Sequence, residues 1–274
     1  MVPRFFKQEI MNEKEELVQR WDVFLTKIEE RFNELMNTAV QATDKVVEQL
    51  EYDNSIVVNA WSGIQAQIRK LQDKMESVWE EKMDDLFGMR EDVSSDDRLG
   101  QMYKYEDLSK RMDTEYLRAK TKVLANAGRK IIANVNRHID TNKMHACKQC
   151  GAPMDIRIYS FVARNVKCGA CATVNSYEPD SRVRALEHFA IVQLADELVI
   201  DQSVREEEIG HEIWKLDERK PHEAVKVEAL RKELVIVRKN RLATYYRFLM
   251  DQVPDKADSY QSKLNERLKW AESV

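Results

Sequence analysis

Residues 57–78, with the sequence VVNAWSGIQAQIRKLQDKMESV, carry apolar side chains at alternating steps of four and three positions. The apolar positions are Val57, Trp61, Ile64, Ile68, Leu71, Met75 and Val78. This alternation places the apolar side chains on one face of an α-helix, and it matches the heptad spacing of coiled coils. The stretch therefore predicts a long amphipathic helix that packs against other helices.

The same apolar pattern extends back to Leu17, and it predicts one continuous helix over residues 13–87. Between residues 42 and 54 every step is four residues long, as in a stutter that locally removes left-handed supercoil. Asn54 is the polar position of the pattern. It either fixes the register of a coiled coil or marks a kink or an exposed turn.

A second helix is predicted over residues 101–139, after a polar loop that runs from Gly88 to Gly100. Because this loop is short relative to the helices, the two helices are expected to form an antiparallel hairpin. The second helix is much shorter than the first. The C-terminal helices or a second copy of the chain must therefore cover the rest of the apolar stripe.

The composition of the 274-residue chain also favours a helical fold. Hydrophobic residues make up 43% of it, which is enough for a packed core. Seven Gly and five Pro are too few for a turn-rich β-sandwich or a doubly wound α/β domain.

No apolar run approaches the roughly 18 residues of a transmembrane helix. The N-terminus reaches charged residues, from Arg4 onward, before any apolar region forms, which predicts no secretory signal. A soluble, cytoplasmic protein is therefore expected.

The cysteines of the chain all lie within residues 147–171, in the pattern C-x2-C-x17-C-x2-C. They are Cys147, Cys150, Cys168 and Cys171. Two residues between thiolates let one tight turn, or knuckle, present both sulfurs to a tetrahedral ion at about 2.3 Å. The neighbouring Gly151 and Gly169 are expected to let each knuckle turn, so that backbone N–H groups face the thiolates. The pattern predicts one structural Zn²⁺ per chain.

Residues 144–178 resemble the C4 zinc-ribbon class, in which two knuckles hold a structural zinc beneath a small sheet. Alternating stretches at 154–159 and 161–166 predict short strands, and residues 173–177 predict a third. The resemblance implies a structural metal site. It implies no particular function, because zinc ribbons occur in transcription factors, ribosomal proteins and many scaffolds.

Other uses of the cysteines stay open on sequence alone. Two disulfides conflict with the missing secretory signal, and a redox-active C-x-x-C normally comes with a βαβ setting that is absent here. Iron in place of zinc fits the same spacing. A catalytic zinc needs an open coordination position, which four thiolates do not leave. His145 is a substitute ligand in principle, although the four cysteines already complete the site.

The formal charge of −4 is unevenly distributed along the chain. Residues 118–171 hold eleven Lys and Arg against two Asp, a charge of +9, while the rest holds 33 basic against 46 acidic residues, a charge of −13. The basic stretch indicates contact with nucleic acid or an acidic partner. The candidate contacts are Lys148, Arg157, Arg164 and Lys167, with Tyr159 and Phe161 as stacking groups.

An alternative is that the basic stretch faces acidic residues of the chain itself or of a second copy. Residues 76–97 and the glutamates at 206–208 are the acidic runs available. The sequence pI of 5.9 favours this alternative, because dedicated nucleic-acid binders are usually basic overall.

The sequence contains no complete catalytic motif. Glu208 and His211 match half of a di-iron carboxylate motif, whose second half is absent. A Gly-rich phosphate loop, an H-E-x-x-H motif and a G-x-S-x-G motif are also missing. We therefore expect no enzyme, no small-molecule substrate and no membrane partner.

Residues 179–274 predict further helices that begin near Pro179, Pro221 and Pro254 and pack on the helical hairpin. The predicted fold is mainly α, an elongated helical hairpin or bundle with an inserted small β zinc ribbon. Its predicted parts are residues 1–143, 144–178 and 179–274. We interpret the chain as a scaffold or adaptor for protein–protein interaction or self-assembly, with a nucleic-acid-binding or transcription-associated factor as the alternative.

Overall fold

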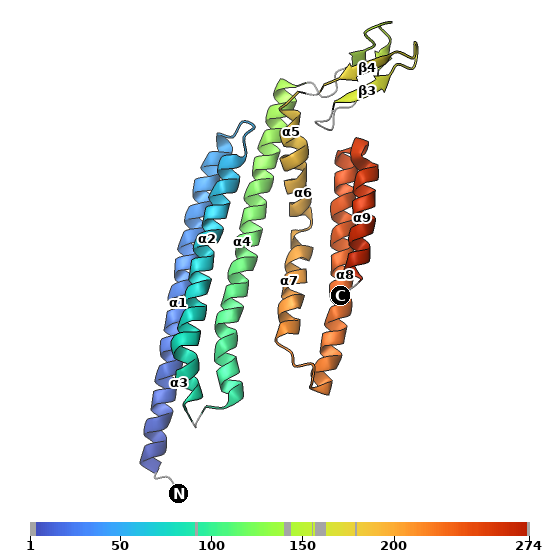
Figure 1. Cartoon of the computed structure of the whole chain (residues 1–274). Coiled ribbons are helices and arrows are strands. Elements are labelled where there is room, and N and C mark those ends of the chain that lie inside the picture. Colours follow the sequence, from blue (N-terminus) through green and yellow to red (C-terminus); the bar gives the residue numbers. More distant parts are fainter. Residues whose placement is uncertain are drawn as a thin grey trace. The chain divides into compact units, whose positions relative to one another are not determined.

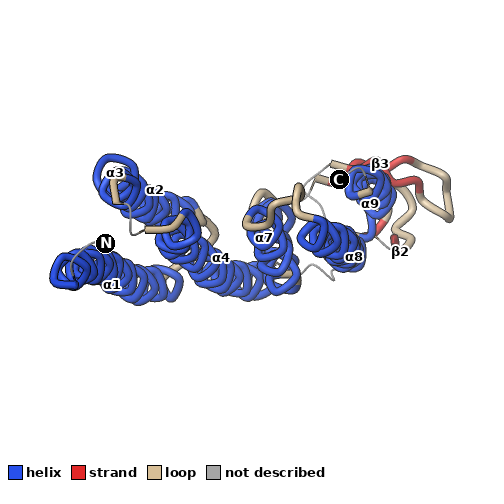
Figure 2. The backbone as a smooth tube through the Cα atoms, turned by 90° about the horizontal axis from the view of Figure 1, so that it is seen from below, coloured by secondary structure: helices blue, strands red, loops and turns tan. Residues whose placement is uncertain are grey.

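The structure is a computed structural model of the whole chain. It describes residues 4–90, 93–139, 144–154, 156, 163–178 and 180–272, with the side chains of residues 4–13 and 255 left out of the description. Helices account for most of the described chain, and its β structure consists of two small antiparallel sheets of two strands each (Figures 1 and 2). The predicted mainly α fold with a small β insertion is confirmed.

The elements are as follows along the chain. The N-terminal part contains α1 (Arg4–Glu48), α2 (Ser55–Val78), the π-helical turn η1 (Trp79–Met83), α3 (Asp84–Gly88) and α4 (Ser95–His138). The strands are β1 (His145–Ala146), β2 (Pro153–Met154), β3 (Arg164–Lys167) and β4 (Val174–Tyr177). The C-terminal part contains α5 (Val183–Ala185), the π-helical turn η2 (Leu186–Ala190), α6 (Ile191–Leu198), α7 (Ile200–Trp214), α8 (Pro221–Gln252), the 3₁₀ turn η3 (Pro254–Lys256) and α9 (Ala257–Ala271).

The prediction of one continuous helix over residues 13–87 is wrong, because α1 ends at Glu48 and the chain turns back into α2 (Figure 1). Asn54, the polar position of the apolar stripe, lies in this connection. Of the two alternatives for Asn54, the turn is therefore the one found in the structure. Asp53 caps the first turn of α2 by accepting a hydrogen bond from the backbone N–H of Ser55 at 2.9 Å. That hydrogen bond also lowers the pKa of the Asp53 carboxyl.

A distant side chain holds this turn in place. Asn134 of α4 is buried, and its amide donates hydrogen bonds to the backbone carbonyls of Leu50 and Glu51, each at 2.9 Å. These two carbonyls follow the last turn of α1, where helical partners run out. The hydroxyl of Tyr52 donates to the carbonyl of Asn134 at 3.5 Å. The bend between α1 and α2 therefore depends on contacts with a helix more than 80 residues further along the chain.

The chain divides into two compact units, one made of residues 1–44 and 58–120, the other of residues 45–57 and 121–274. The predicted division at residues 143 and 178 stays a prediction.

Three long helices, α1, α2 and the first part of α4, build most of the first unit in place of the predicted two-helix hairpin. The helix α1 and the first part of α4 run parallel, because Lys14 pairs with Asp97 at 3.0 Å and Asp22 with Lys104 at 2.5 Å. The helix α2 runs antiparallel to α4. The side chain of Gln72 in α2 donates hydrogen bonds to Ser109 and Asp113 of α4. Further along α4, the hydroxyl of Tyr116 donates to the carbonyl of Trp61, which lies nearer the start of α2.

The helix α4 begins six residues before the predicted start at residue 101. A capping box explains the earlier start: the backbone N–H of Asp97 donates to Ser94 Oγ at 3.1 Å, and the N–H of Ser94 donates to Asp97 Oδ2 at 3.3 Å. Part of the predicted polar loop from Gly88 to Gly100 is therefore helical.

The second unit contains the end of α4, the strands and the C-terminal helices. Helices begin after residue 179, at Pro221 and after Pro254, as predicted. They contact α4 through a close approach at Gly128, where an added Cβ would lie 3.0 Å from the carbonyl oxygen of Ala190. Ion pairs join α7 to α8, with the Glu206 carboxylate between Arg238 at 2.5 Å and Arg241 at 2.9 Å.

Candidate metal centre

Two β-hairpins carry the four cysteines. In the first, β1 pairs antiparallel with β2, and in the second β3 pairs antiparallel with β4. Each C-x-x-C pair lies in the turn of one hairpin. The β4 strand confirms the short strand predicted over residues 173–177, and β3 covers the end of the strand predicted over residues 161–166. Most of the strand predicted over residues 154–159 lies outside the described residues.

The two turns have the same backbone hydrogen bonds. In the first, the N–H of Cys147 donates to the carbonyl of Ala152 at 2.9 Å, and the N–H of Gly151 donates back to the carbonyl of Cys147 at 2.9 Å. The second turn repeats both bonds in the same register, Cys168 to Thr173 at 2.9 Å and Ala172 to Cys168 at 3.0 Å. The repeated geometry gives two equivalent knuckles.

The four sulfurs converge on one point. All four lie within 4.8 Å of one another, and two close pairs join the two knuckles, Cys147 to Cys171 at 3.6 Å and Cys150 to Cys168 at 3.7 Å. A tetrahedral ion with metal–sulfur bonds of about 2.3 Å separates its ligands by roughly 3.8 Å. The sulfur positions therefore fit a four-coordinate metal ion, and the cysteines are free thiols, without the disulfides considered above.

Backbone and side-chain donors favour the thiolate form of two of these cysteines. The backbone N–H at Cys150 and the amide of Asn175 lower the pKa of Cys147 to about 6. The hydroxyl and backbone N–H of Thr173 lower the pKa of Cys171. The predicted orientation of N–H groups toward the sulfurs is thus present in both knuckles.

Cys150 behaves in the opposite way. The backbone N–H of Ala152 favours its thiolate, but the sulfur of Cys171, some desolvation and the sulfurs of Cys168 and Cys147 together raise its pKa to about 12. Four thiolates repel one another at these distances. A bound cation would remove this repulsion, so the cluster is electrostatically suited to a metal ion.

The structure supports the expected role in the knuckle turn for Gly151 and not for Gly169. Gly151 follows the first knuckle with φ of 72°, in the left-handed region that glycine favours. The equivalent position of the second knuckle is Ala172, with φ of 61°, whereas Gly169 has no positive φ. The prediction that Gly169 lets the second knuckle turn is therefore wrong, and Ala172 makes that turn.

We expect the Gly151→Ala variant to bind metal several-fold more weakly than the wild type. A Cβ at Gly151 meets nothing within 4 Å, so the substitution adds only the left-handed strain of a non-glycine residue, about 1–2 kcal/mol. Chelator competition measures the affinity. Gly169→Ala is the matched control, because its Cβ also meets open space and its backbone needs no positive φ. Equal affinities of the two variants would contradict the prediction.

Asn175 is a residue of the site that the sequence analysis missed. It lies on β4, is 6% exposed, and its side chain contacts Cys147 and both knuckles. The available signal was an asparagine within a predicted strand, where this residue type is uncommon.

His145 does not belong to the cluster. Among the described residues, the atoms that converge as metal ligands are the four sulfurs. The imidazole of His145 instead packs edge-on against the ring of Tyr177, with 4.6 Å between ring centroids.

Among the described residues, two of the proposed nucleic-acid contacts lie on opposite faces of one strand. Lys148, Arg164 and Lys167 are exposed. Arg164 and Lys167 lie three positions apart on β3, so their side chains leave opposite faces of the strand. Arg157, Tyr159 and Phe161 lie outside the described residues. Contact of the stretch 118–171 with nucleic acid stays a prediction.

Three of the acidic residues proposed as partners of the basic stretch pair with residues outside it. Glu206 pairs with two arginines of α8, Glu208 pairs with Arg205 at 3.5 Å, and Asp97 pairs with Lys14. Within the basic stretch, Arg129 of α4 does form an ion pair inside the chain, with Glu197 of α6. The structure therefore does not support neutralisation of the basic stretch by Glu206 or Glu208 of the same chain.

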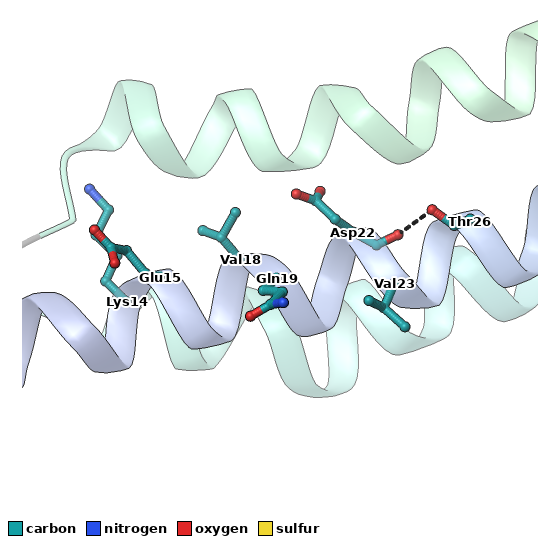
Figure 3. Close-up of a pocket in the computed structure, with 7 residues that line it drawn as sticks. All are labelled: Lys14, Glu15, Val18, Gln19, Asp22, Val23 and Thr26. Carbon is teal, nitrogen blue, oxygen red and sulfur yellow. Dashed lines mark hydrogen bonds between the residues drawn. The ribbon is translucent and has the colours of Figure 1, made fainter.

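The described residues do not supply a second half of the di-iron motif at Glu208 and His211, because their cluster of potential metal ligands is the four cysteines. His211 stacks on Trp214 at 5.6 Å between ring centroids. A groove of about 550 Å³ along α1 is lined by Lys14, Glu15, Val18, Gln19, Asp22, Val23 and Thr26 (Figure 3). Its acidic Asp22 is paired with Lys104, and its Thr26 hydroxyl donates to the Asp22 carbonyl.

The chain matches no protein-family model, no curated protein and no solved structure. None of the helices in the described residues combines the length and the apolar character that a membrane span requires.

Proposed function

We propose that this protein is a non-enzymatic helical scaffold or adaptor, whose β insertion is held by one structural Zn²⁺ per chain. The supporting observation is the convergence of the four sulfurs at the spacing of a tetrahedron. Four thiolates around a tetrahedral ion are typical of structural zinc. The protein supplies all four ligands, so no coordination position is left for water or a substrate.

Exposed aromatic and aliphatic side chains support a role in protein–protein interaction or self-assembly. Trp214 at the end of α7 is 52% exposed, Trp270 of α9 is 56% exposed, and Val225 of α8 is 72% exposed. Tryptophan is enriched among the residues that dominate protein interfaces.

The free thiols favour a reducing compartment, for which we propose the cytoplasm.

Two measurements on the purified chain test the proposal. Metal analysis is expected to find one zinc per chain, and iron or a content far below one per chain would overturn the zinc assignment. Sedimentation over a range of concentrations, compared with a Trp214→Ser/Trp270→Ser variant, tests self-assembly. A wild type that stays monomeric while binding DNA or RNA in a salt-dependent way would instead favour the nucleic-acid alternative.

A further inference from the structure

We infer that Asn175 is a positioning residue of the metal centre, which joins the two knuckles and orients the sulfur of Cys147 toward the metal ion. This inference rests on the proposed zinc site and deepens it, because it names the residue outside the ligand set that determines how tightly the ion is held.

The contacts of Asn175 fix the orientation of its amide. Its Oδ1 accepts a hydrogen bond from the backbone N–H of Lys148 at 2.9 Å, and its Nδ2 donates to the carbonyl of Thr173 at 3.1 Å. A backbone N–H needs an acceptor and a carbonyl needs a donor, so the two ends of the amide are not interchangeable. The group that faces Cys147 Sγ at 3.4 Å is therefore the NH₂ end, which donates to the sulfur.

These contacts reach from one hairpin to the other. Asn175 and Thr173 belong to the second hairpin, whereas Lys148 and Cys147 belong to the first. The two sheets share no strand pairing, so the described hairpins are joined by side chains. The buried amide holds the first knuckle against the second in the arrangement that brings sulfurs of both knuckles together.

The hydrogen bond to Cys147 also acts on the charge of the site. Four thiolates and one divalent cation carry a net charge of −2, which N–H donors to sulfur disperse. Residues that orient and hydrogen-bond metal ligands typically change metal affinity by about 10- to 100-fold when they are replaced. Because Asn175 is 6% exposed, water does not readily take over its bonds.

The test uses the Asn175→Asp variant of the full chain. Aspartate has the same shape and keeps an acceptor for the Lys148 N–H, but it loses the donor to Cys147 and adds a negative charge. Asn165→Asp is the matched control, because Asn165 lies in the facing strand β3, is exposed, and receives the same change of charge. Zinc affinity is measured by chelator competition, and the cobalt-loaded proteins are compared by their thiolate-to-cobalt absorption bands.

We expect Asn175→Asp to bind zinc about 10- to 100-fold more weakly than the wild type. Its cobalt bands should shift, because the Cys147 sulfur has lost its hydrogen bond, whereas Asn165→Asp should retain both the affinity and the spectrum. A purely structural role of Asn175 would leave the spectrum of the fully loaded variant unchanged. If Asn175→Asp does not fold, Asn175→Ser carries the same comparison without the added charge.

Unchanged affinity and spectrum in a zinc-binding wild-type background would overturn the role of Asn175 alone. A wild type that binds no zinc would overturn the proposed metal site and this inference together. The two failures are thus distinguishable.

Discussion

Removal of zinc by a strong chelator is expected to unfold the β insertion and to leave the helices folded. The core of the insertion is small: its buried residues are Cys147, Met154 and Cys168, packed against the partly buried Ala152, Ile156 and Val166. Two of the three buried side chains are themselves proposed metal ligands. Structural zinc contributes about 10–16 kcal/mol to binding in zinc-finger peptides, far more than so small a core supplies.

The helices have their own cores, which do not contain the metal ligands. One such cluster is formed by Ile191, Ala195, Leu249 and Val253, with partly buried aromatic side chains around it. The far-ultraviolet dichroism of the helices should therefore change little on chelation, while hydrogen exchange of residues 164–177 should lose its protection. Cys168→Ser should reproduce this loss in the presence of zinc, and Ser176→Ala on the exposed side of β4 should not. Protection that persists after chelation, or a collapse of the helical signal, would contradict this expectation.

The sequence predicted the helices because helical periodicity is a local property. The stripe of Val57, Trp61, Ile64 and Ile68 is buried as expected. The break between α1 and α2 was only an alternative left open at Asn54, because the same steps of four residues fit both a stutter and a turn. What decides between them is the pair of hydrogen bonds from Asn134, which lies more than 80 residues away in sequence.

The metal site shows the same division between local and distant information. Tetrahedral coordination and the C-x-x-C turn constrain the cysteines within a few residues, so their spacing was sufficient to predict all four. Asn175 was missed because its partners Lys148 and Cys147 lie on the other hairpin. Ala172 was missed because alanine, unlike glycine, gives no indication in the sequence that its φ is positive.

Replacement of Trp21 by alanine is expected to lower the free energy of unfolding of the first unit by about 3–5 kcal/mol. The Trp21 side chain is 1% exposed, and its ring contacts Phe24, Trp79 and Tyr105 at centroid distances of 5.4, 5.7 and 6.2 Å. Its indole N–H donates to the carbonyl of Gln101 at 3.1 Å, which joins α1 to α4. The substitution removes this packing between three segments and leaves a cavity among large rings.

Trp214→Ala, measured at a protein concentration at which the chain is monomeric, is the matched control, because that side chain is 52% exposed and the same atoms are deleted. We expect it to lower the free energy of unfolding by less than about 1 kcal/mol. Urea unfolding followed by helical dichroism measures both variants, and equal shifts of the midpoint would contradict the assigned core.

Both units contain part of α4, so the shape of the Trp21→Ala unfolding curve carries further information. A separate early transition would mean that the first unit unfolds alone, and one sharp transition would mean that α4 couples the two units.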